Sequence, residues 1–211
     1  MSQLILASAS PRRAELLRQL GLTFTVMVSG IAEEKIAEPV SAERLVGQLA
    51  LQKGHTVAAR VAKGIVIAAD TIVELNGQLL GKPATKQQAK EMLKALSGNV
   101  HYVFTGLAVI KMPQKLILTD VVKTAVYMRR LTEQEIDWYI DSGEPFDKAG
   151  GYGIQGKAAV FIEKLEGCYF NVVGLPLAAL WKLLVKAGFF LGEGAEKNDN
   201  TAPDHQRSAT E

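Results

Sequence analysis

The stretch G-I-V-I-A-A-D-T, residues 64–71, decides the fold of this 211-residue chain. Its first six residues are apolar or small, which predicts a strand over 64–69 that is covered on both faces. Asp70 follows at the expected end of that strand, and ligands of α/β sheets collect outside the carboxyl ends of strands. In that place Asp70 would hold a metal ion or activate water. A turn aspartate that bonds to nearby backbone fits the position equally well.

Helical and strand patterns alternate along the chain on both sides of this stretch. Ser10 is a candidate N-cap before Pro11, and Thr132 with Glu135 forms a capping-box pattern. Asn76-Gly77 is a strong hairpin signal within 74–80. This alternation, with hairpins in the middle, favours an α/β fold with a mixed sheet. Further strands are expected over 4–7, 23–28, 100–110, 116–127 and 158–165, and helices over 11–20, 41–62, 85–96, 132–140 and 176–186.

The sequence S-A-S-P-R-R, residues 8–13, lies at an expected strand-to-helix junction. A helix N-terminus has unpaired N–H groups and a partial positive charge, so it binds anions. Arg12 and Arg13 in the first turn oppose that dipole unless an anion is bound, and arginine bonds well to phosphate oxygens. We therefore favour a phosphate site here over the alternative of a solvated arginine. Lys53 and Lys82 would each reach a phosphate or remain solvated.

The glycine-rich loop over 143–156 contains two motif-like patterns that we reject. Gly151, Gly153 and Gly156 fit G-x-G-x-x-G, and residues 151–157 fit G-x-x-x-x-G-K. Both motifs require a strand before and a helix after, whereas here a strand is expected after the loop. The glycines still allow close backbone approach to a ligand. Gln155 has the donor and the acceptor needed to read the polar edge of a base.

The composition is that of an ordinary globular protein. Hydrophobic residues make up 48% and charged residues 22%, which excludes a wholly disordered chain. The net charge of +2 is too small to indicate nucleic acid or an anionic membrane as a partner. Residues 192–211 hold five acids against two bases, so this tail is −3 and the rest is +5, which suits a small anionic ligand. We expect one domain over 1–191 and a disordered acidic tail over 192–211.

The single cysteine, Cys168, and the first residues of the chain favour a cytoplasmic location. One cysteine forms no intramolecular disulfide, which is compatible with a reducing compartment. The N-terminal residues lack the basic region of a signal peptide. The longest apolar stretch, 175–191, is interrupted by Lys182 and Lys186 and predicts a packed helix rather than a membrane span. The sequence leaves open whether the chain forms a homodimer.

In combination, these motifs resemble those of the Maf family of nucleoside triphosphate pyrophosphatases over about residues 4–188. The resemblance implies an elongated mixed sheet with helices around it and a cleft between two lobes, as in the inosine triphosphate pyrophosphatases. It also implies hydrolysis of a nucleoside triphosphate to the monophosphate and pyrophosphate with a divalent metal, Mg²⁺ or Mn²⁺. The matching motifs are S-A-S-P-R-R at 8–13, A-A-D-T-I-V at 68–73, G-K-P at 81–83, L-S-G at 96–98, T-G at 105–106, G-E-P-F-D-K-A-G-G-Y-G-I-Q-G at 143–156 and N-V-V-G-L-P at 171–176.

The resemblance also implies roles for individual residues. Asp70 is the expected proton acceptor, and Asp70 and Glu33 are the expected metal-holding acids. Arg12, Thr71 and Gln155 match positions linked to substrate choice, and their pattern resembles the subgroup that acts on dTTP and UTP, including modified pyrimidine nucleotides. The expected polar residues around the phosphates are Ser8, Ser10, Arg13, Lys53 and Lys82.

An alternative from another class of protein stays open beside the enzyme. The family has been associated with arrest of septum formation, so a role in cell division is a further expectation from the resemblance. The alternative is a non-catalytic regulator of cell division that binds nucleotide. Asp70 and the basic residues argue against it, because a pure binder does not need an acid that activates water.

Overall fold

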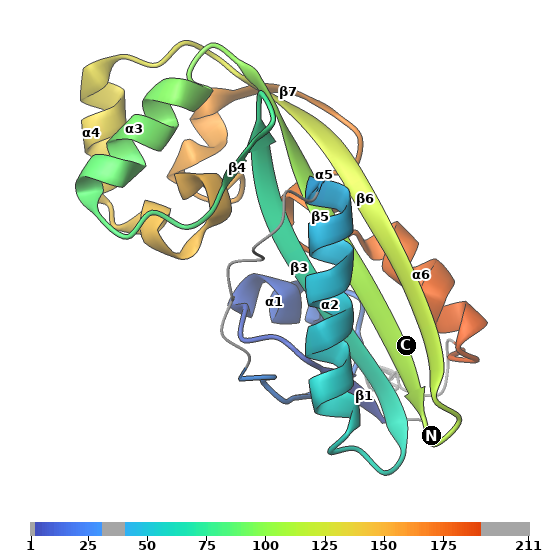
Figure 1. Ribbon diagram of the computed structural model, residues 1–211. Helices are drawn as coiled ribbons and strands as arrows, with labels where there is room; N and C mark the ends of the chain where they lie inside the picture. Colours follow the sequence, from blue (N-terminus) through green and yellow to red (C-terminus); the bar gives the residue numbers. More distant parts are fainter. Residues whose placement is uncertain (1–2, 31–40, 191–211) are drawn as a thin grey trace, which may run out of the picture.

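One mixed sheet runs through the computed structural model, which describes residues 3–30 and 41–190 (Figure 1). Within these residues seven strands pair in the order β2-β1-β3-β5-β6-β7, and β4 pairs with β3. β1 is parallel to β2 and β3, and the remaining pairs are antiparallel. The strands are β1 (Leu4–Leu6), β2 (Phe24–Val26), β3 (Gly64–Leu75), β4 (Gln78–Leu80), β5 (Val100–Met112), β6 (Leu116–Met128) and β7 (Ile162–Glu166).

Helices cover both faces of this sheet (Figure 1). α2 packs on one face, against Ala68 and Ala108, and α1 and α6 pack on the other, against Ile67 and Leu107. This double cover explains why residues 64–70 are buried without interruption. The helices are α1 (Pro11–Gln19), α2 (Ala42–Ala58), α3 (Lys86–Leu96), α4 (Glu133–Asp141), α5 (Tyr169–Val173) and α6 (Leu177–Lys186), with short 3₁₀ helices η1 (Glu144–Asp147), η2 (Ala149–Gly151) and η3 (Lys157–Phe161).

A second apolar cluster forms a smaller lobe at the upper left of Figure 1. There α3 and α4 pack with Val73 of β3 and Val103 of β5, around the buried rings of Tyr139 and Phe161. Because β3 and β5 run through both clusters, the two lobes share one sheet. The expected mixed α/β fold with helices around an elongated sheet is confirmed.

β3 is longer than the sequence predicts, and its length changes the place of Asp70. The strand continues to Leu75, so Asp70 lies in its middle, opposite Gly106 of β5. The prediction that the strand ends at Asp70 is wrong, because the polar Asp-Thr pair interrupts the apolar run without ending the strand. β1 pairs with residues 65–67 and β4 with 73–75, so neither covers the β3 edge between them.

Outside β3, some predictions of caps, turns and element bounds are confirmed and others are wrong. The capping box of Thr132 and Glu135 is present, and the positive φ angles of Asn76 and Gly77, 50° and 81°, confirm the hairpin turn. Ser10 holds the N-cap position, but its side chain makes no capping hydrogen bond. The predicted strand over 158–165 is wrong in its first half, which is η3, and the long helix ends at Ala58. α5 was not predicted, since five residues are too few for a helical period to show.

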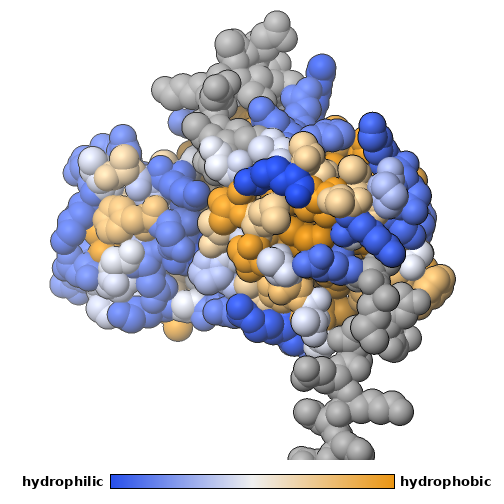
Figure 2. Space-filling model, turned by 90° about the horizontal axis from the view of Figure 1, so that it is seen from below, coloured by the Kyte–Doolittle hydropathy of each residue, from blue (hydrophilic) through white to orange (hydrophobic). Residues whose placement is uncertain are grey.

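The surface differs between the two lobes. Seen from below, hydrophobic residues gather on the larger lobe, whereas the lobe of α3 and α4 is mostly hydrophilic (Figure 2). Among the described residues, no helix has the length and apolar character needed to cross a membrane. The predicted tail over 192–211 lies outside the part of the chain that the structure describes.

Candidate active site

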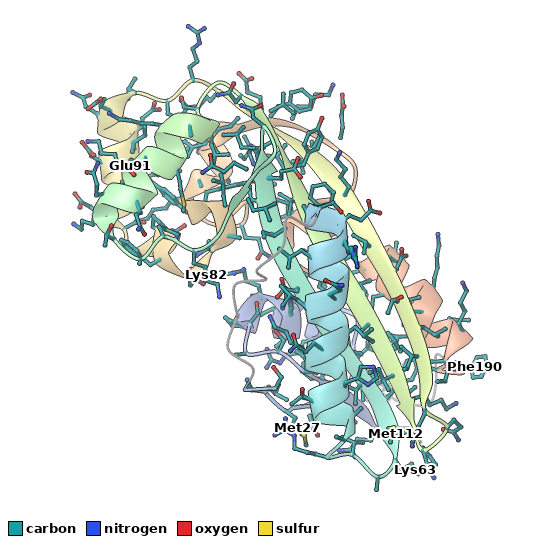
Figure 3. All side chains as sticks on the ribbon, viewed as in Figure 1. Met27, Lys63, Lys82, Glu91, Met112 and Phe190 are labelled. Carbon is teal, nitrogen blue, oxygen red and sulfur yellow. The ribbon has the colours of Figure 1, made fainter. Side chains whose placement is uncertain are left out.

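A cavity of about 400 Å³ opens between the lobes, beside the uncovered edge of β3. Its walls come from the β1–α1 junction, α2, β3, the segment after β4, the η1–η3 region and α5. Lys82 lies on the smaller lobe, on the side that faces α1 (Figure 3). The cavity brings together nine of the expected site residues: Ser8, Ser10, Arg12, Arg13, Lys53, Asp70, Thr71, Lys82 and Gln155. Glu33 lies outside the described residues.

Asp70 forms an ion pair with Lys53 of α2. The two side chains are only 9% and 13% exposed, so the pair is largely removed from water. The close approach of α2 to the sheet makes this contact possible. A Cβ on Gly106, the residue opposite Asp70, would lie 2.2 Å from the carbonyl oxygen of Val46, so only glycine fits beneath the helix.

Arg13 connects four parts of the site through its guanidinium group. Its Nε donates to the Gly174 carbonyl at 2.8 Å, and Nη1 donates to Ser8 Oγ at 3.1 Å and to the Ala69 carbonyl at 2.9 Å. Its Nη2 donates to Thr71 Oγ1 at 3.0 Å. Arg13 therefore occupies part of the uncovered edge of β3 and orders the wall around it. The sequence predicts that Arg13 contacts a phosphate. Its four hydrogen bonds also join Gly174, Ser8, Ala69 and Thr71, so Arg13 has a structural role in addition.

Arg12 reaches across the cavity to the smaller lobe. Its Nη1 lies 2.7 Å from Asp147 Oδ2 of η1, and Lys148 Nζ lies 2.5 Å from the other carboxylate oxygen. Partial burial raises the pKa of Asp147, but the hydrogen bonds from Lys148 and Arg12 outweigh it and hold the pKa below its ordinary value. The three residues form a charged connection between the lobes.

The first turn of α1 adds positive potential to the same wall. Pro11 starts the helix and no acidic residue lies in the first turn, so nothing there offsets the partial charge of the helix N-terminus. Ser8 Oγ accepts a hydrogen bond from the Ser10 backbone N–H at 3.2 Å, which shapes the turn before the helix. This junction suits a phosphate group, as the sequence predicts.

The glycine-rich loop forms the opposite wall, and its glycines serve close packing. A Cβ on Gly156 would lie 2.1 Å from Glu144 Oε2, and one on Gly153 would lie 2.5 Å from Lys148 Cε. The loop presents Gln155, which is exposed, to the cavity. The loop contains η1 and η2 and runs directly into η3, so no strand precedes its glycines, which confirms the rejection of both nucleotide-binding motifs.

Sequence reasoning did not single out several polar residues at the site. Asp147, Lys148 and Tyr152 line the cavity, and Thr105 and Asn171 are buried behind Thr71. Asp147 and Thr105 lie within the quoted motifs, so their positions were available as a signal. Their partners were not, because Arg12 and Asp147 are 135 residues apart in the sequence.

The donor set is compatible with a magnesium-like ion that also binds phosphate oxygens. The described residues contain no group of three His, Cys, Asp or Glu side chains that would hold a metal alone. Mg²⁺ is commonly bound through one or two carboxylates together with substrate phosphates, and Asp70 supplies one such carboxylate in the cavity.

The fold and this cavity define an α/β protein with a basic cleft around one buried lysine–aspartate pair. The chain belongs to the Maf family: the model of that family, described as Maf-like protein, matches residues 3–187. A dTTP/UTP pyrophosphatase from Carboxydothermus hydrogenoformans is 47% identical over 89% of this chain and 100% of its own length. One of the same name from Alkaliphilus oremlandii is 52% identical over 87% of this chain and 95% of its own.

A solved structure gives a weaker likeness. A nucleoside-triphosphatase / dITP/XTP pyrophosphatase from Mycobacterium abscessus aligns with a TM-score of 0.39 and 14% identity, over 61% of this chain and 75% of that chain. A likeness of this size adds nothing to what the sheet order and the family already establish.

Proposed function

We propose that this protein hydrolyses dTTP and UTP to the nucleoside monophosphate and pyrophosphate. The observation that carries the proposal is the buried pair of Asp70 and Lys53 in a cleft whose other charged walls are mainly basic. The names of the relatives, which match along nearly their whole length, support the same reaction. Modified pyrimidine nucleotides belong to the same proposal.

The chemistry follows from the placement of charge. Water attacks the α-phosphorus in line with the leaving pyrophosphate, and Asp70 orients that water and accepts its proton. Phosphoryl transfer depends mostly on positioning and on neutralising the phosphate charge. Lys53, Lys82, Arg12 and the N-terminus of α1 supply the positive charge in the cleft. A divalent ion, Mg²⁺ or Mn²⁺, would be held by Asp70 and the phosphates and would add Lewis-acid stabilisation when bound.

The base is read by residues at the two sides of the cleft. Gln155 on the loop and Thr71 on β3 both line the cavity and both have groups that bond to the polar edge of a pyrimidine. Arg12, which already contacts Asp147, completes the set proposed for substrate choice. Loss of one hydrogen bond of this kind to the base costs about 1–3 kcal/mol in discrimination.

Pyrophosphate release from a panel of canonical and modified nucleoside triphosphates, with Mg²⁺ or Mn²⁺, tests the function. We expect release from dTTP and UTP, and its near-complete loss in Asp70→Asn. Asp141→Asn is the matched control, because that carboxylate is exposed on α4 and pairs with Lys86 away from the cleft. An active Asp70→Asn protein would remove Asp70 from its role as base. A folded protein that binds these nucleotides without releasing pyrophosphate would favour the regulator of cell division instead.

A further inference from the structure

Behind Thr71 lies a second hydroxyl that the proposed reaction does not yet use. Thr105 of β5 is directly opposite Thr71 in the strand register and is fully buried. The two Oγ1 atoms are 2.9 Å apart, and Thr105 Oγ1 is also 3.2 Å from the carbonyl oxygen of Asn171 in α5. Arg13 also contacts Thr71, with its Nη2 donating to Thr71 Oγ1 at 3.0 Å.

The contact of Thr105 with the Asn171 carbonyl, together with the number of protons, sets the direction of this hydrogen-bond chain. Each threonine hydroxyl has one proton, and a carbonyl oxygen has none. The Thr105 proton lies toward the Asn171 carbonyl, because without it two lone pairs would face each other at 3.2 Å in a buried place. The Thr71 proton must then fill the 2.9 Å contact with Thr105, since the guanidinium of Arg13 only donates. The chain runs from Arg13 through Thr71 and Thr105 to the Asn171 carbonyl.

This direction leaves the Thr71 hydroxyl as an acceptor toward the cleft. Thr71 lines the cavity, and Gly174 lies beside its hydroxyl. A Cβ on Gly174 would lie 3.5 Å from Thr71 Oγ1, so the absence of a side chain there leaves room next to the hydroxyl. Uracil and thymine present an N–H donor at N3, whereas cytosine presents a lone pair at the same ring position. An acceptor at Thr71 therefore matches the first two bases and repels the third.

We propose that Thr105 is a positioning residue for substrate choice, which turns the Thr71 proton away from the cleft so that Thr71 accepts the N3–H of uracil or thymine. This inference rests on the proposed function, because it assigns to Thr71 one edge of the bases of dTTP and UTP. Thr105 does not touch the substrate, and its effect passes through the hydroxyl of Thr71.

The test compares kcat/KM for dTTP and dCTP in Thr105→Val, which keeps the shape and removes the hydroxyl. With Thr105 gone, the Thr71 proton turns toward the cleft, and we expect the dTTP-to-dCTP ratio to fall about tenfold. Thr105→Ser keeps the hydroxyl and should retain the ratio. An unchanged dTTP-to-dCTP ratio, with or without an equal loss of activity on both nucleotides, would overturn the inference. It would mean that Thr105 has only a structural role.

Thr124→Val is the matched control. Thr124 is a buried threonine on the neighbouring strand β6, and it bonds to Cys168 and to the Asn171 side chain without reaching Thr71. It should leave the nucleotide ratio unchanged even if stability falls. A fall in the ratio equal to that of Thr105→Val would also overturn the inference.

Two further measurements keep the inference testable if Thr105→Val does not fold. Thr105→Ala removes the same hydroxyl with less bulk and should lower the same ratio. The wild-type protein should use N3-methyluridine triphosphate, which has no N3–H, at least tenfold less efficiently than UTP, and equal use would contradict the inference. Absence of pyrophosphate release from dTTP by the wild type is a failure of the proposed function, and is seen before any ratio is taken.

Discussion

Lys53 and Asp70 form one buried pair that supports the fold and has a part in the proposed reaction. Each side chain lies in a place with little water, so each needs the opposite charge of the other. The lysine also keeps a positive charge beside the acid that is proposed to take a proton from water. The pairing does not show in the sequence, where the two residues are 17 positions apart and belong to different elements.

Lys53→Met should lower both stability and activity, because it leaves the Asp70 carboxylate buried without its partner. We expect the free energy of unfolding to fall by about 3 kcal/mol and kcat/KM for dTTP to fall by about 100-fold. Urea unfolding and pyrophosphate release measure the two effects. In the double variant Lys53→Met/Asp70→Asn, part of the lost stability should return. A double variant less stable than Lys53→Met alone would contradict the explanation.

His101 is a buried histidine of the smaller lobe whose ring titrates far from its ordinary range. Its Nε2 lies 2.6 Å from the Tyr152 hydroxyl, and burial lowers its pKa to about 4. Between about pH 6.5 and 4 the unfolded chain binds a proton that the folded chain does not. The stability due to neutral His101 is therefore complete above pH 6.5 and is lost as the pH falls toward 4, by up to roughly 3 kcal/mol.

Unfolding free energies of the wild type and His101→Phe at several pH values test this dependence. The wild type should lose stability from pH 6.5 to 4.5 more steeply than the variant, since phenylalanine does not titrate. Tyr152→Phe is the control, because it removes the hydroxyl that contacts the ring and keeps the histidine buried. Parallel pH curves for wild type and His101→Phe would rule out the histidine as the cause.

At the scale of elements, the contact of α2 with β3 and β5 sets the geometry of the pair. Gly106 lies under the carbonyl of Val46, and Gly54 lies against the side chains of Ala68 and Ala108. Small residues on both surfaces bring the helix close to the sheet, and Lys53, next to Gly54, then reaches Asp70. Both residues of the T-G motif at 105–106 thus lie opposite site residues of β3, Thr105 opposite Thr71 and Gly106 opposite Asp70.

Gly106→Ala should push α2 away from the sheet, because the new Cβ meets backbone rather than a flexible side chain. We expect a loss of about 1–3 kcal/mol in unfolding free energy and a marked loss of activity as Lys53 leaves Asp70. Gly47→Ala on α2 is the matched control, since its Cβ would make only ordinary contact, 3.5 Å from Val121. That control should be neutral or more stable by up to about 1 kcal/mol. An active, stable Gly106→Ala protein would be evidence against close helix packing as the reason for the glycine.

The elements themselves were largely predictable from local chemistry, and the exceptions have physical causes. Caps and turn residues, such as Thr132 and Asn76, act within a few positions and were interpreted correctly. The length of β3 was not, because Asp70 and Thr71 are held in the strand by partners on β5. Residues 157–161 have strand-like composition, yet they form η3, where Phe161 packs between Tyr139 and Trp138 of α4.

At the scale of the whole molecule, the cleft is a positively charged space between two lobes. Its described lining holds five basic residues, Arg12, Arg13, Lys53, Lys82 and Lys148, against Asp70 and Asp147, a difference of three positive charges. The motifs of the sequence predicted a set of site residues, and nine of these residues line the cavity, whereas Glu33 lies outside the described residues. The sequence did not predict the contacts among them, since the Arg13 bonds and the Arg12–Asp147 pair depend on chain segments that only the fold brings together.

The charge of the cleft should make nucleotide binding depend on ionic strength. Screening at the mouth of the cleft weakens the attraction for a triphosphate, so KM for dTTP should rise between about 50 and 300 mM KCl. The kcat should change less, because the buried Lys53–Asp70 pair is screened little. Sucrose at matched osmolality controls for effects other than charge. A KM that is independent of salt would contradict electrostatic attraction by the cleft.

Hydrolysis of dTTP in ¹⁸O-labelled water, followed by mass spectrometry of the products, tests the central claim most directly. The claim is that a water molecule, oriented and deprotonated by Asp70, attacks the α-phosphorus and that pyrophosphate leaves. It predicts that dTMP carries the ¹⁸O, that pyrophosphate carries none, and that Asp70→Asn yields neither product. Label in the pyrophosphate, or dTDP and phosphate as products, would contradict the account.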